Sequence, residues 1–283
     1  MREKRGMTQN KTNVEKKVEQ PKIILTIAGS DILSGGGIQA DLATFTEYGL
    51  FGLSVITSIV TVKADTFTIT LIDLDLVAAQ LASIEENYQL SAIKIGLVPS
   101  VEMIKLVGTF VQRVGQNIPV VVDPVMVFKE NGSVPIQELV DAFKSDLLPF
   151  ATVTTPNLTE TKMLAGGIEI ANEVDLQVAA QNILDSGAKA VVAKGGTRLN
   201  KKTAIDVLVA KDVVKVFQAP IVNAKFNNGA GCTFSSAIAS QLALGQEIET
   251  AVQNAKDFVF QGIKHGVAIS PEFGNVWQGA NRL

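Results

Sequence analysis

The sequence predicts an α/β fold in which a mostly parallel β-sheet has helices on both faces. From Lys22 onward, short apolar runs bounded by turn residues alternate with segments whose apolar residues recur at helical spacing. Helical segments of this length between strands indicate βαβ units, which build parallel sheets. The composition is globular, with 47% hydrophobic and 19% charged residues among 283, so the chain can bury a large core.

Each element follows from its local pattern. The run 53–62 is rich in β-branched residues, which favour strands. Ser100 directly precedes a helical pattern, as an N-cap does. The runs 203–210 and 212–220 predict a hairpin. We expect strands at 22–29, 53–62, 66–74, 92–98, 118–124, 151–157, 188–196, 203–210 and 212–220, and helices at 36–49, 75–88, 101–114, 136–146, 157–165, 173–186, 230–243 and 247–264.

The organisation of the chain is simple. Residues 1–21 are expected to form a flexible, charged tail and residues 22–283 a single domain, because no repeat or linker interrupts the pattern. No apolar segment follows the charged start and no run of about 18 apolar residues occurs, so neither a signal peptide nor a spanning helix is expected. One cysteine excludes an intrachain disulfide, which fits a reducing cytoplasm. The net charge of −3 argues against a nucleic-acid binder with a basic surface.

Unusual polar residues stand where the expected strands end. In open parallel sheets, ligands bind outside the carboxyl ends of the strands. These residues are therefore candidates for one common site. They are Ser30, Asp31, Lys94, Asp123, Asn157, Glu160 and Lys194.

The only cysteine, Cys232, lies in "FNNGAGCTFSSAIAS", where Gly229, Ala230 and Gly231 lead into an expected helix. Backbone amides at a glycine-rich helix start can form a concavity for an anion, and the helix dipole adds positive charge there. The same field is expected to lower the pKa of the Cys232 thiol from its usual value of about 8.5. The alternative is a glycine-rich cap with an inert cysteine, since free cysteines are commonly buried.

A second glycine-rich segment, "GSDILSGGGIQAD" at 29–41, also lies between an expected strand and an expected helix. It matches neither G-x-G-x-x-G nor G-x-x-x-x-G-K-[ST], so a NAD(P)-dependent oxidoreductase or a P-loop is poorly supported. We expect Gly35–Gly37 to form a close-packed turn over a substrate, with Ser30 and Asp31 facing it. A purely structural turn is the alternative.

Two acidic residues and a lysine complete the phosphate-handling candidates. Asp123 and Glu160 could hold Mg²⁺ directly or through water, although Glu160 also fits a helix capping box that needs no metal. Lys194 precedes two glycines and could neutralise nucleotide phosphates, or could simply be solvated. The only histidine, His265, lacks the context of a Ser-His-Asp triad, and no Cys/His cluster indicates zinc. These patterns alone indicate a phosphate-binding α/β enzyme.

Five ordered motifs resemble the ribokinase-like superfamily, whose fold is a three-layer α/β/α sandwich. The nearer resemblance is to bacterial hydroxymethylpyrimidine (phosphate) kinases and the related pyridoxal kinases of vitamin B6 salvage. It covers about Lys22 to Gly266, and it implies an enzyme that transfers the γ-phosphoryl group of ATP to a hydroxymethyl group on a flat heteroaromatic ring. The motifs are "ILTIAGSD…GGGIQADL", "VVDPVMV", "LLPFATVTTPNLTE", "KGG" and "NGAGCTFSSAIA".

The resemblance also implies roles for individual residues. The amides of Gly229, Ala230 and Gly231 would form the anion hole. Cys232 would stand where sugar kinases carry a catalytic aspartate, as the candidate base for the substrate hydroxyl. Positioning should matter more than full deprotonation, because phosphoryl transfer passes through a loose transition state. ATP and Mg²⁺ would be bound by Asn157, Glu160, Lys194 and Thr233, and the metal itself by Asp123 and Glu160. The substrate ring would be bordered by Gly29, Ser30, Asp31, Phe128 and the segment 61–65 with Lys63.

Four positions depart from the family pattern, in addition to Leu97 and Val98, where the pyrimidine kinases often have Gly-Met or Met-Leu. Leu33 replaces a small or hydroxyl residue, and Asn228 replaces a histidine of the pyrimidine kinases. Lys63 replaces an aspartate that related pyridoxal kinases tend to carry. Phe128 occupies the place of a second cysteine used by one pyridoxal kinase subgroup, so a two-cysteine relay is impossible here.

The substrate stays open between two heterocycles. The turn "GAGC" and the segment "IVTVKADTF" favour pyridoxal, and a hydroxymethylpyrimidine (phosphate) kinase is the alternative. The four departures also motivate a catalytically decayed homologue that still binds ATP. Cysteine in place of aspartate argues against a sugar kinase. A homodimer is expected by analogy with the family.

Overall fold

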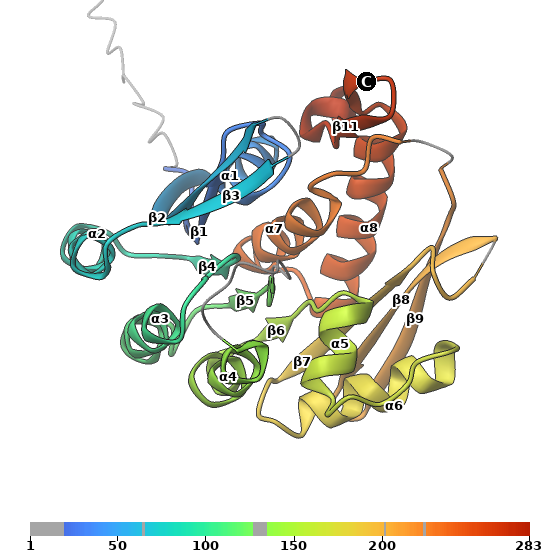
Figure 1. The fold of residues 1–283 in the computed structure, drawn as a ribbon, viewed down its shortest axis with the longest axis horizontal. Coiled ribbons are helices and arrows are strands. Elements are labelled where there is room, and N and C mark those ends of the chain that lie inside the picture. The colour runs from blue at the N-terminus through green and yellow to red at the C-terminus, as the bar shows by residue number, and fades with distance from the viewer. Residues whose placement is uncertain (1–19, 64–65, 127–134, 201, 223–224) are drawn as a thin grey trace, which may run out of the picture.

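The computed structural model describes residues 20–63, 66–126, 135–200, 202–222 and 225–283. One nine-stranded sheet organises these residues, in the strand order β3-β2-β1-β4-β5-β6-β7-β8-β9 (Figure 1). Pairing is parallel from β2 across to β7 and antiparallel at both edges, which confirms the predicted mostly parallel sheet. The strands are β1 (Ile23–Asp31), β2 (Phe51–Lys63), β3 (Thr66–Leu71), β4 (Ala92–Ile95), β5 (Val120–Val122), β6 (Val153–Thr154), β7 (Ala190–Gly196), β8 (Thr203–Ala210) and β9 (Val213–Pro220).

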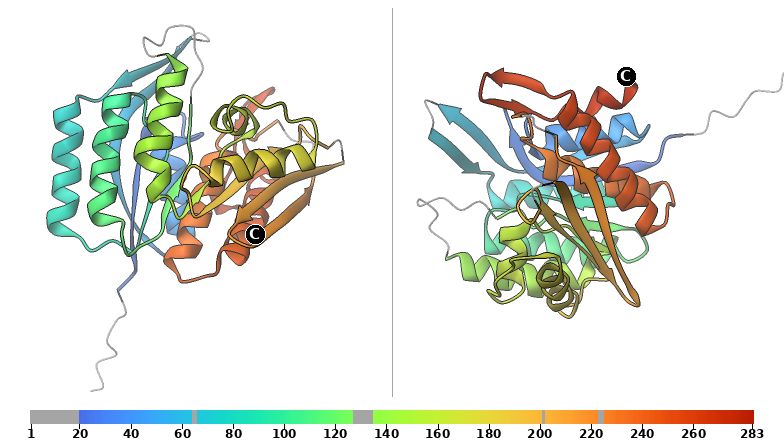
Figure 2. Two further views of the ribbon diagram at one scale, coloured as in Figure 1. Left: turned by 90° about the horizontal axis from the view of Figure 1, so that it is seen from below. Right: turned by 90° about the vertical axis from the view of Figure 1, so that its right-hand side faces the viewer.

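Eight α-helices in the described part of the chain cover the sheet from both sides, as expected for the ribokinase-like α/β/α sandwich (Figures 1 and 2). One hydrophobic cluster packs α2 to α6 against one face of the sheet, and a second packs α1, α7 and α8 against the other. Because one sheet carries both clusters, we propose that the described residues form one domain. The helices are α1 (Gly37–Glu47), α2 (Leu74–Asn87), α3 (Val101–Val114), α4 (Ile136–Ala142), α5 (Leu158–Leu164), α6 (Glu173–Leu184), α7 (Ala230–Ala243) and α8 (Ile248–Lys264).

Local signals place most elements correctly. The side chain of Ser100 accepts a hydrogen bond from the Met103 amide and caps α3, as predicted. The helix expected at 136–146 keeps α-helical geometry only to Ala142 and continues as a π-helical turn over Phe143–Leu147. Of the strand expected at 118–124, only β5 joins the ladder. No helix in the described ranges combines the length and apolarity needed to cross a membrane.

One element was not predicted. Strands β10 (Val267–Ser270) and β11 (Phe273–Asn275) form a short antiparallel hairpin after α8, followed by a 3₁₀ turn at Gln278–Arg282. Its strands are mostly exposed, so the sequence lacks the continuous apolar run that marks a buried strand. Asn275 at the end of β11 forms a bridge with Asn228, which brings the hairpin against the start of α7.

Candidate active site

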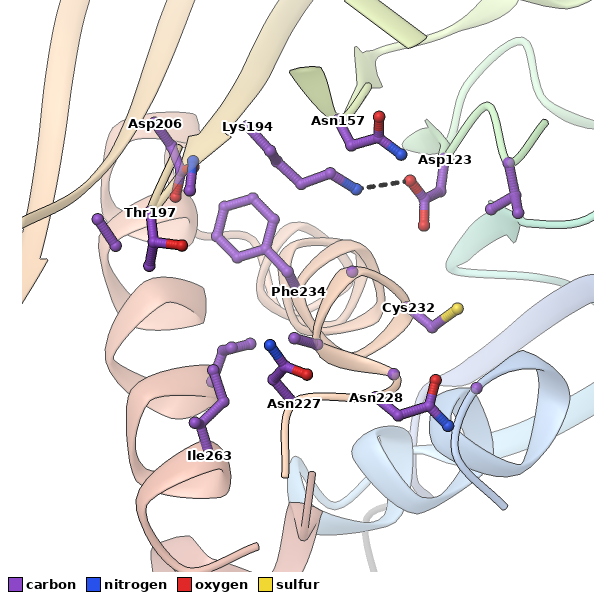
Figure 3. A pocket seen from close by; sticks show the side chains of 18 of the residues that line it. Asp123, Asn157, Lys194, Thr197, Asp206, Asn227, Asn228, Cys232, Phe234 and Ile263 are labelled. Atoms are coloured by element: carbon purple, nitrogen blue, oxygen red, sulfur yellow. Dashed lines mark hydrogen bonds and ion pairs between the residues drawn. The ribbon is translucent and has the colours of Figure 1, made fainter. Parts of the chain in front are cut away.

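A cavity of about 670 Å³ opens at the carboxyl edge of the parallel strands. Since parallel strands end at the same edge, β1, β5, β6 and β7 deliver Asp31, Asp123, Asn157 and Lys194 to it. The first turn of α7 forms part of the wall between the two ends of the cavity (Figure 3). One end is lined by Gly29, Asp31, Val60, Phe67 and Leu97, and the other by Thr197, Arg198, Ala204, Ala219, Pro220, Ile221, Val222, Asn227, Val259, Phe260 and Ile263.

The turn at Gly229–Gly231 has the geometry of an anion site. Gly229 has φ +83°, and a Cβ there would lie 1.4 Å from the Gly35 carbonyl oxygen, so only glycine fits. The Ala230 amide donates to the carbonyl of Asn227, and no side chain caps the start of α7. The remaining positive end of the helix therefore faces the cavity that these residues line.

A buried ion pair lies beside this turn. The Lys194 ammonium is 2.8 Å from Asp123 Oδ1 (Figure 3), and a Cβ on Gly231 would lie 3.3 Å from the same ammonium. Burial alone would raise the pKa of Asp123, but the positive charges of Lys194 and Lys94 hold it below its usual value. Asp123 is thus a carboxylate, and Lys194 carries its positive charge at the anion turn.

Glu160 forms the predicted capping box and also lines the cavity. Its side chain accepts from the Asn157 amide while the Asn157 side chain accepts from the Thr159 and Glu160 amides, which is the predicted capping box of α5. Burial raises the pKa of Glu160 to about 7, against the lowering charge of Lys194. Glu160 lines the same cavity as the turn at Gly229–Gly231, so it stays available to a ligand there.

The oxygen donors present fit Mg²⁺ bound with help from a nucleotide. No group of three or more His, Cys, Asp or Glu side chains that could hold a metal occurs within the described ranges. Mg²⁺ in phosphoryl-transfer sites takes one or two carboxylates, and substrate phosphates and waters complete its shell. Asp123 and Glu160 line the same cavity and meet that requirement. Asp123 is already paired with Lys194, which favours contact with the metal through water.

The pKa of the Cys232 thiol differs from the expected one. Its half-buried side chain lines the cavity at the first turn of α7. A lowered thiol pKa was expected there, but burial raises it to about 11, and Asp41 and Asp123 add to that effect. Lys94 and a hydrogen bond from the Gly37 backbone act in the opposite direction without overcoming burial. The helix field is therefore outweighed by loss of solvent, and at neutral pH the group is predominantly a thiol.

The segment after β1 is organised by Asp31. Its two carboxylate oxygens accept from the amides of Leu33, Gly35 and Gly36, at 3.0 to 3.1 Å. Gly29 and Asp31 line the cavity, whereas the Ser30 hydroxyl accepts from Gln39 away from it. Asp31 therefore holds the glycine-rich turn in shape beside the substrate end.

Several other predicted residues lie elsewhere. Thr233 is fully buried and its hydroxyl accepts from Gln278 at 3.0 Å, outside the cavity lining. Lys63, at the end of β2, is exposed and does not line the cavity, nor do Thr61 and Val62. Their neighbours Val60 and Phe67 do. Phe128 and residues 64–65 lie outside the described part of the chain.

Sequence reasoning missed a second buried pair in the cavity wall. The Lys256 ammonium on α8 lies 2.6 Å from Asp206 on β8. Asp206 Oδ1 also accepts from the Gly196 amide at 3.4 Å, at the end of β7. The sequence shows one charged residue within the apolar run of β8, Asp206, and one on the apolar side of α8, Lys256. This signal does not indicate that the two residues pair with each other.

The C-terminal hairpin joins both glycine-rich segments through Asn275. This buried side chain donates from Nδ2 to the Leu33 carbonyl at 2.7 Å, and its Oδ1 accepts from Asn228 Nδ2 at 3.0 Å. Two family departures, Leu33 and Asn228, thus meet at one residue that the sequence did not single out. The C-terminal residues, which nothing in the sequence tied to a site, therefore support this one.

Replacing Asn275 with alanine is expected to lower kcat by about tenfold, because the anion turn loses its link to the glycine-rich turn and small displacements of catalytic groups are costly. The free energy of unfolding should fall by about 1–3 kcal/mol, since Asn228 and Leu33 lose a buried partner. Steady-state kinetics and thermal unfolding measure the two effects. Asn254→Ala, at an exposed hydrogen bond to Gln241, is the control. Equal kcat in both variants would contradict this role.

Comparison with known proteins identifies the family. The phosphomethylpyrimidine kinase family matches residues 31–277. The chain is 38% identical over 262 residues to a pyridoxine kinase of Bacillus subtilis, covering 92% of this chain and 96% of that protein. It is 37% identical over 262 residues to a hydroxymethylpyrimidine/phosphomethylpyrimidine kinase of Haemophilus influenzae, covering 90% and 97%.

Solved structures of similar kinases support the same family assignment. An ADP complex of Bacillus subtilis pyridoxal kinase superimposes with a TM-score of 0.88 at 37% identity, covering 93% of this chain and all of that one. Staphylococcus aureus pyridoxal kinase in complex with AMP-PCP and pyridoxal gives 0.86 at 35% identity, covering 93% and 95%. A phosphomethylpyrimidine kinase of Clostridium difficile gives 0.71 at 35% identity, covering 84% and 99%. The chain belongs to the phosphomethylpyrimidine kinase family of the ribokinase-like superfamily, a family of phosphotransferases that act on alcohol groups.

Proposed function

We propose that this protein transfers the γ-phosphoryl group of ATP to the hydroxymethyl group of pyridoxal. The observation that carries the proposal is the single cavity in which Cys232 and the anion turn lie between two differently lined ends. Two ligands that meet at this turn would place an acceptor hydroxyl against a terminal phosphate. The structure of the Staphylococcus aureus relative, which is described as a complex with AMP-PCP and pyridoxal, supports this pairing of ligands.

The nucleotide would occupy the end formed by β8, β9 and α8. Apolar side chains there, including Val222, Val259 and Ile263, suit a nucleobase, since cofactor sites are mostly apolar with a few placed polar groups. The phosphates would then extend toward Lys194 and the amides at Gly229–Gly231, where positive charge is concentrated. Asn157 lines the cavity close to this path and would contact the phosphates or their waters.

Asp123 and Glu160 would hold Mg²⁺, which would neutralise negative charge on the phosphates during transfer. Loss of the Glu160 proton, expected near pH 7, would add negative charge for the metal. Lys194 would keep Asp123 ionised and fixed in direction whether or not nucleotide is present.

The pyridoxal ring would lie at the other end, against Val60, Phe67 and Leu97. The hydroxymethyl oxygen forms the new bond to the γ-phosphorus while the bond from that phosphorus to the β–γ bridging oxygen breaks and ADP leaves. The hydroxyl proton passes to the Cys232 sulfur in its thiolate form. Burial keeps the thiolate scarce at neutral pH, so the rate should grow with the thiolate fraction.

Three of the departures from the family pattern, Leu33, Lys63 and Asn228, are compatible with this site. Leu33 and Lys63 do not line the cavity, and Asn228 contributes to the wall through its bond to Asn275. This arrangement favours an active kinase over a catalytically decayed homologue. The TM-scores with pyridoxal kinases, 0.88 and 0.86 against 0.71 for a phosphomethylpyrimidine kinase, support pyridoxal over the pyrimidine. The homodimer stays a prediction.

The test is ADP formation from ATP·Mg²⁺ with pyridoxal and, in parallel, with 4-amino-5-hydroxymethyl-2-methylpyrimidine. We expect kcat/KM to be at least about tenfold higher for pyridoxal, since a site built for one ring leaves polar groups unpaired with the other. The opposite preference would assign the protein to the pyrimidine kinases. ATP binding without turnover of either compound would favour the decayed homologue.

A further inference from the structure

A second charged network lies entirely inside the protein beneath the anion turn. The Lys94 ammonium on β4 is 2.9 Å from Asp41 Oδ2 on α1, and both side chains are completely buried. Asp41 also accepts from Thr26 Oγ1 at 2.6 Å and from Ser236 Oγ at 2.5 Å. Both carboxylate oxygens are thus occupied, and the network ties β1, β4, α1 and α7 together.

Ser236 connects this network to Cys232. The two residues are four apart on α7, so their side chains lie on the same face of the helix, one turn from each other. The N-terminal start of α1 reaches the same place, because a Cβ on Gly36 would lie 3.4 Å from Cys232 Sγ. The starts of α1 and α7 therefore converge on the thiol, with the Lys94–Asp41 pair behind it.

The Lys94 side chain extends toward the cavity edge of β4. A Cβ on Gly96, two residues further along the chain, would lie 2.7 Å from the Lys94 ammonium. In the part of the chain that the structure describes, Asp41 is the one acceptor of this ammonium, which has three N–H groups. Asp41 therefore leaves part of the hydrogen-bonding capacity of this ammonium unused among the described residues.

Four charged groups act on the Cys232 thiol from the surrounding elements: Lys94 on β4, Asp41 on α1, Asp123 after β5 and Lys194 on β7. Burial is the strongest influence and raises the thiol pKa; of the charges, Lys94 has the largest effect and lowers it. Burial would lower the pKa of Lys94 itself, but Asp41 and the other nearby groups raise it above its usual value. Lys94 is charged at every pH at which the protein would work.

Stability alone is a weak reason for such a pair. Taking two charges out of water costs several kcal/mol per ion, and replacing a buried pair by apolar residues is often neutral or stabilising. The position beneath the anion turn suggests a use for the charge.

We propose that Lys94 is a positioning residue of the phosphoryl-transfer site: its ammonium, fixed by Asp41, supplies a permanent positive charge beneath the first turn of α7 and acts there on Cys232 and on the transferred group. The part of the inference that concerns the transfer step rests on the proposed function. The effect of the Lys94 charge on the Cys232 thiol exists without any substrate. No contact with substrate is required of Lys94, since it acts through the turn above it.

The test uses the only cysteine of the chain as a reporter. Iodoacetamide alkylates the thiolate, so the rate of Cys232 alkylation at pH 8 in the ligand-free protein follows the thiolate fraction. Lys94→Met should slow alkylation on the order of tenfold, because the remaining Asp41 charge opposes the thiolate. Lys215→Met, which removes a paired lysine on β9 outside the cavity lining, is the control and should leave the rate unchanged.

A second variant is needed in case Lys94→Met does not fold. Lys94→Met leaves Asp41 as a lone buried charge, so Lys94→Met/Asp41→Asn, which removes both charges, is the deciding variant where the single one does not fold. Alkylation in the double variant should still be slower than in the wild type, because Lys94 outweighs Asp41 at the thiol. Wild-type alkylation rates in whichever variant folds would overturn the proposal.

Kinetics give the second readout. We expect kcat to fall about tenfold in the double variant with KM for ATP unchanged, less than the 10²–10³ typical of removing a direct donor to the reacting group. Unchanged kcat with slowed alkylation would overturn the part of the proposal that concerns the transferred group. Absence of kinase activity in the wild type would instead contradict the proposed function, and the alkylation result would stand by itself.

Discussion

Replacing Cys232 with alanine is expected to lower kcat by about 10²–10⁴-fold, the range that a positioned general base contributes. ATP binding should survive, because the amides of Gly229–Gly231 and the Lys194–Asp123 pair do not depend on the sulfur. Steady-state kinetics with pyridoxal and calorimetric titration with an ATP analogue measure the two quantities separately. A kcat within threefold of the wild type would mean that the thiol is only a small residue at a close-packed turn.

The pH dependence of kcat separates a base from a positioning group. With a thiol pKa of about 11, the thiolate fraction grows about tenfold per pH unit between pH 8 and 10, above the titration of Glu160, so kcat should rise with pH there if the thiolate accepts the proton. Cys232→Asp introduces the carboxylate of the sugar kinases, which is ionised across this range, and should flatten the profile. A flat profile in the wild type would assign the thiol a purely orienting role.

Replacing Lys194 with methionine is expected to lower kcat/KM by about 10²–10³-fold and to raise KM for ATP, because the anion turn loses the cation that faces the phosphates. The substitution also leaves Asp123 buried without its partner, so the free energy of unfolding should fall by about 3–5 kcal/mol. Initial rates over a range of ATP concentrations and urea unfolding measure the two losses.

The double variant Lys194→Met/Asp123→Asn distinguishes lost charge from lost folding. It removes both members of the pair, so stability should return toward the wild-type value while kcat/KM stays low, because the Lys194 charge for the phosphates and the Asp123 carboxylate for the metal are both gone. Recovery of activity together with stability would show that Lys194 serves the fold and not the phosphates. Lys215→Met, at a half-exposed pair with Glu249, is the surface control and should change neither quantity.

The fold could be predicted because its signals are local. Alternation of apolar runs and helical spacing identified all nine strands of the main sheet and all eight helices in the described ranges. The anion turn was recognisable because a helix start that needs φ > 0 requires glycine, as Gly229 shows. Residues such as Asp123, Asn157 and Lys194 could be grouped because parallel strands end at one edge.

Only the tertiary structure decided which of these groups act together and in what state. Asn275 bonds a carbonyl 242 residues away, and Asp41 bonds Ser236 at a separation of 195 residues; neither partner is indicated by local pattern. The sequence predicted a lowered pKa for Cys232 from the helix field, whereas burial raises it. The strands of the main sheet, its helices and the anion turn depend on neighbouring residues, so the sequence alone determined them, whereas the exposed β10–β11 hairpin left no such local signal. Hydrogen-bond partners and ionisation depend on exclusion of water and on charges brought from distant segments, which exist only once the chain has folded.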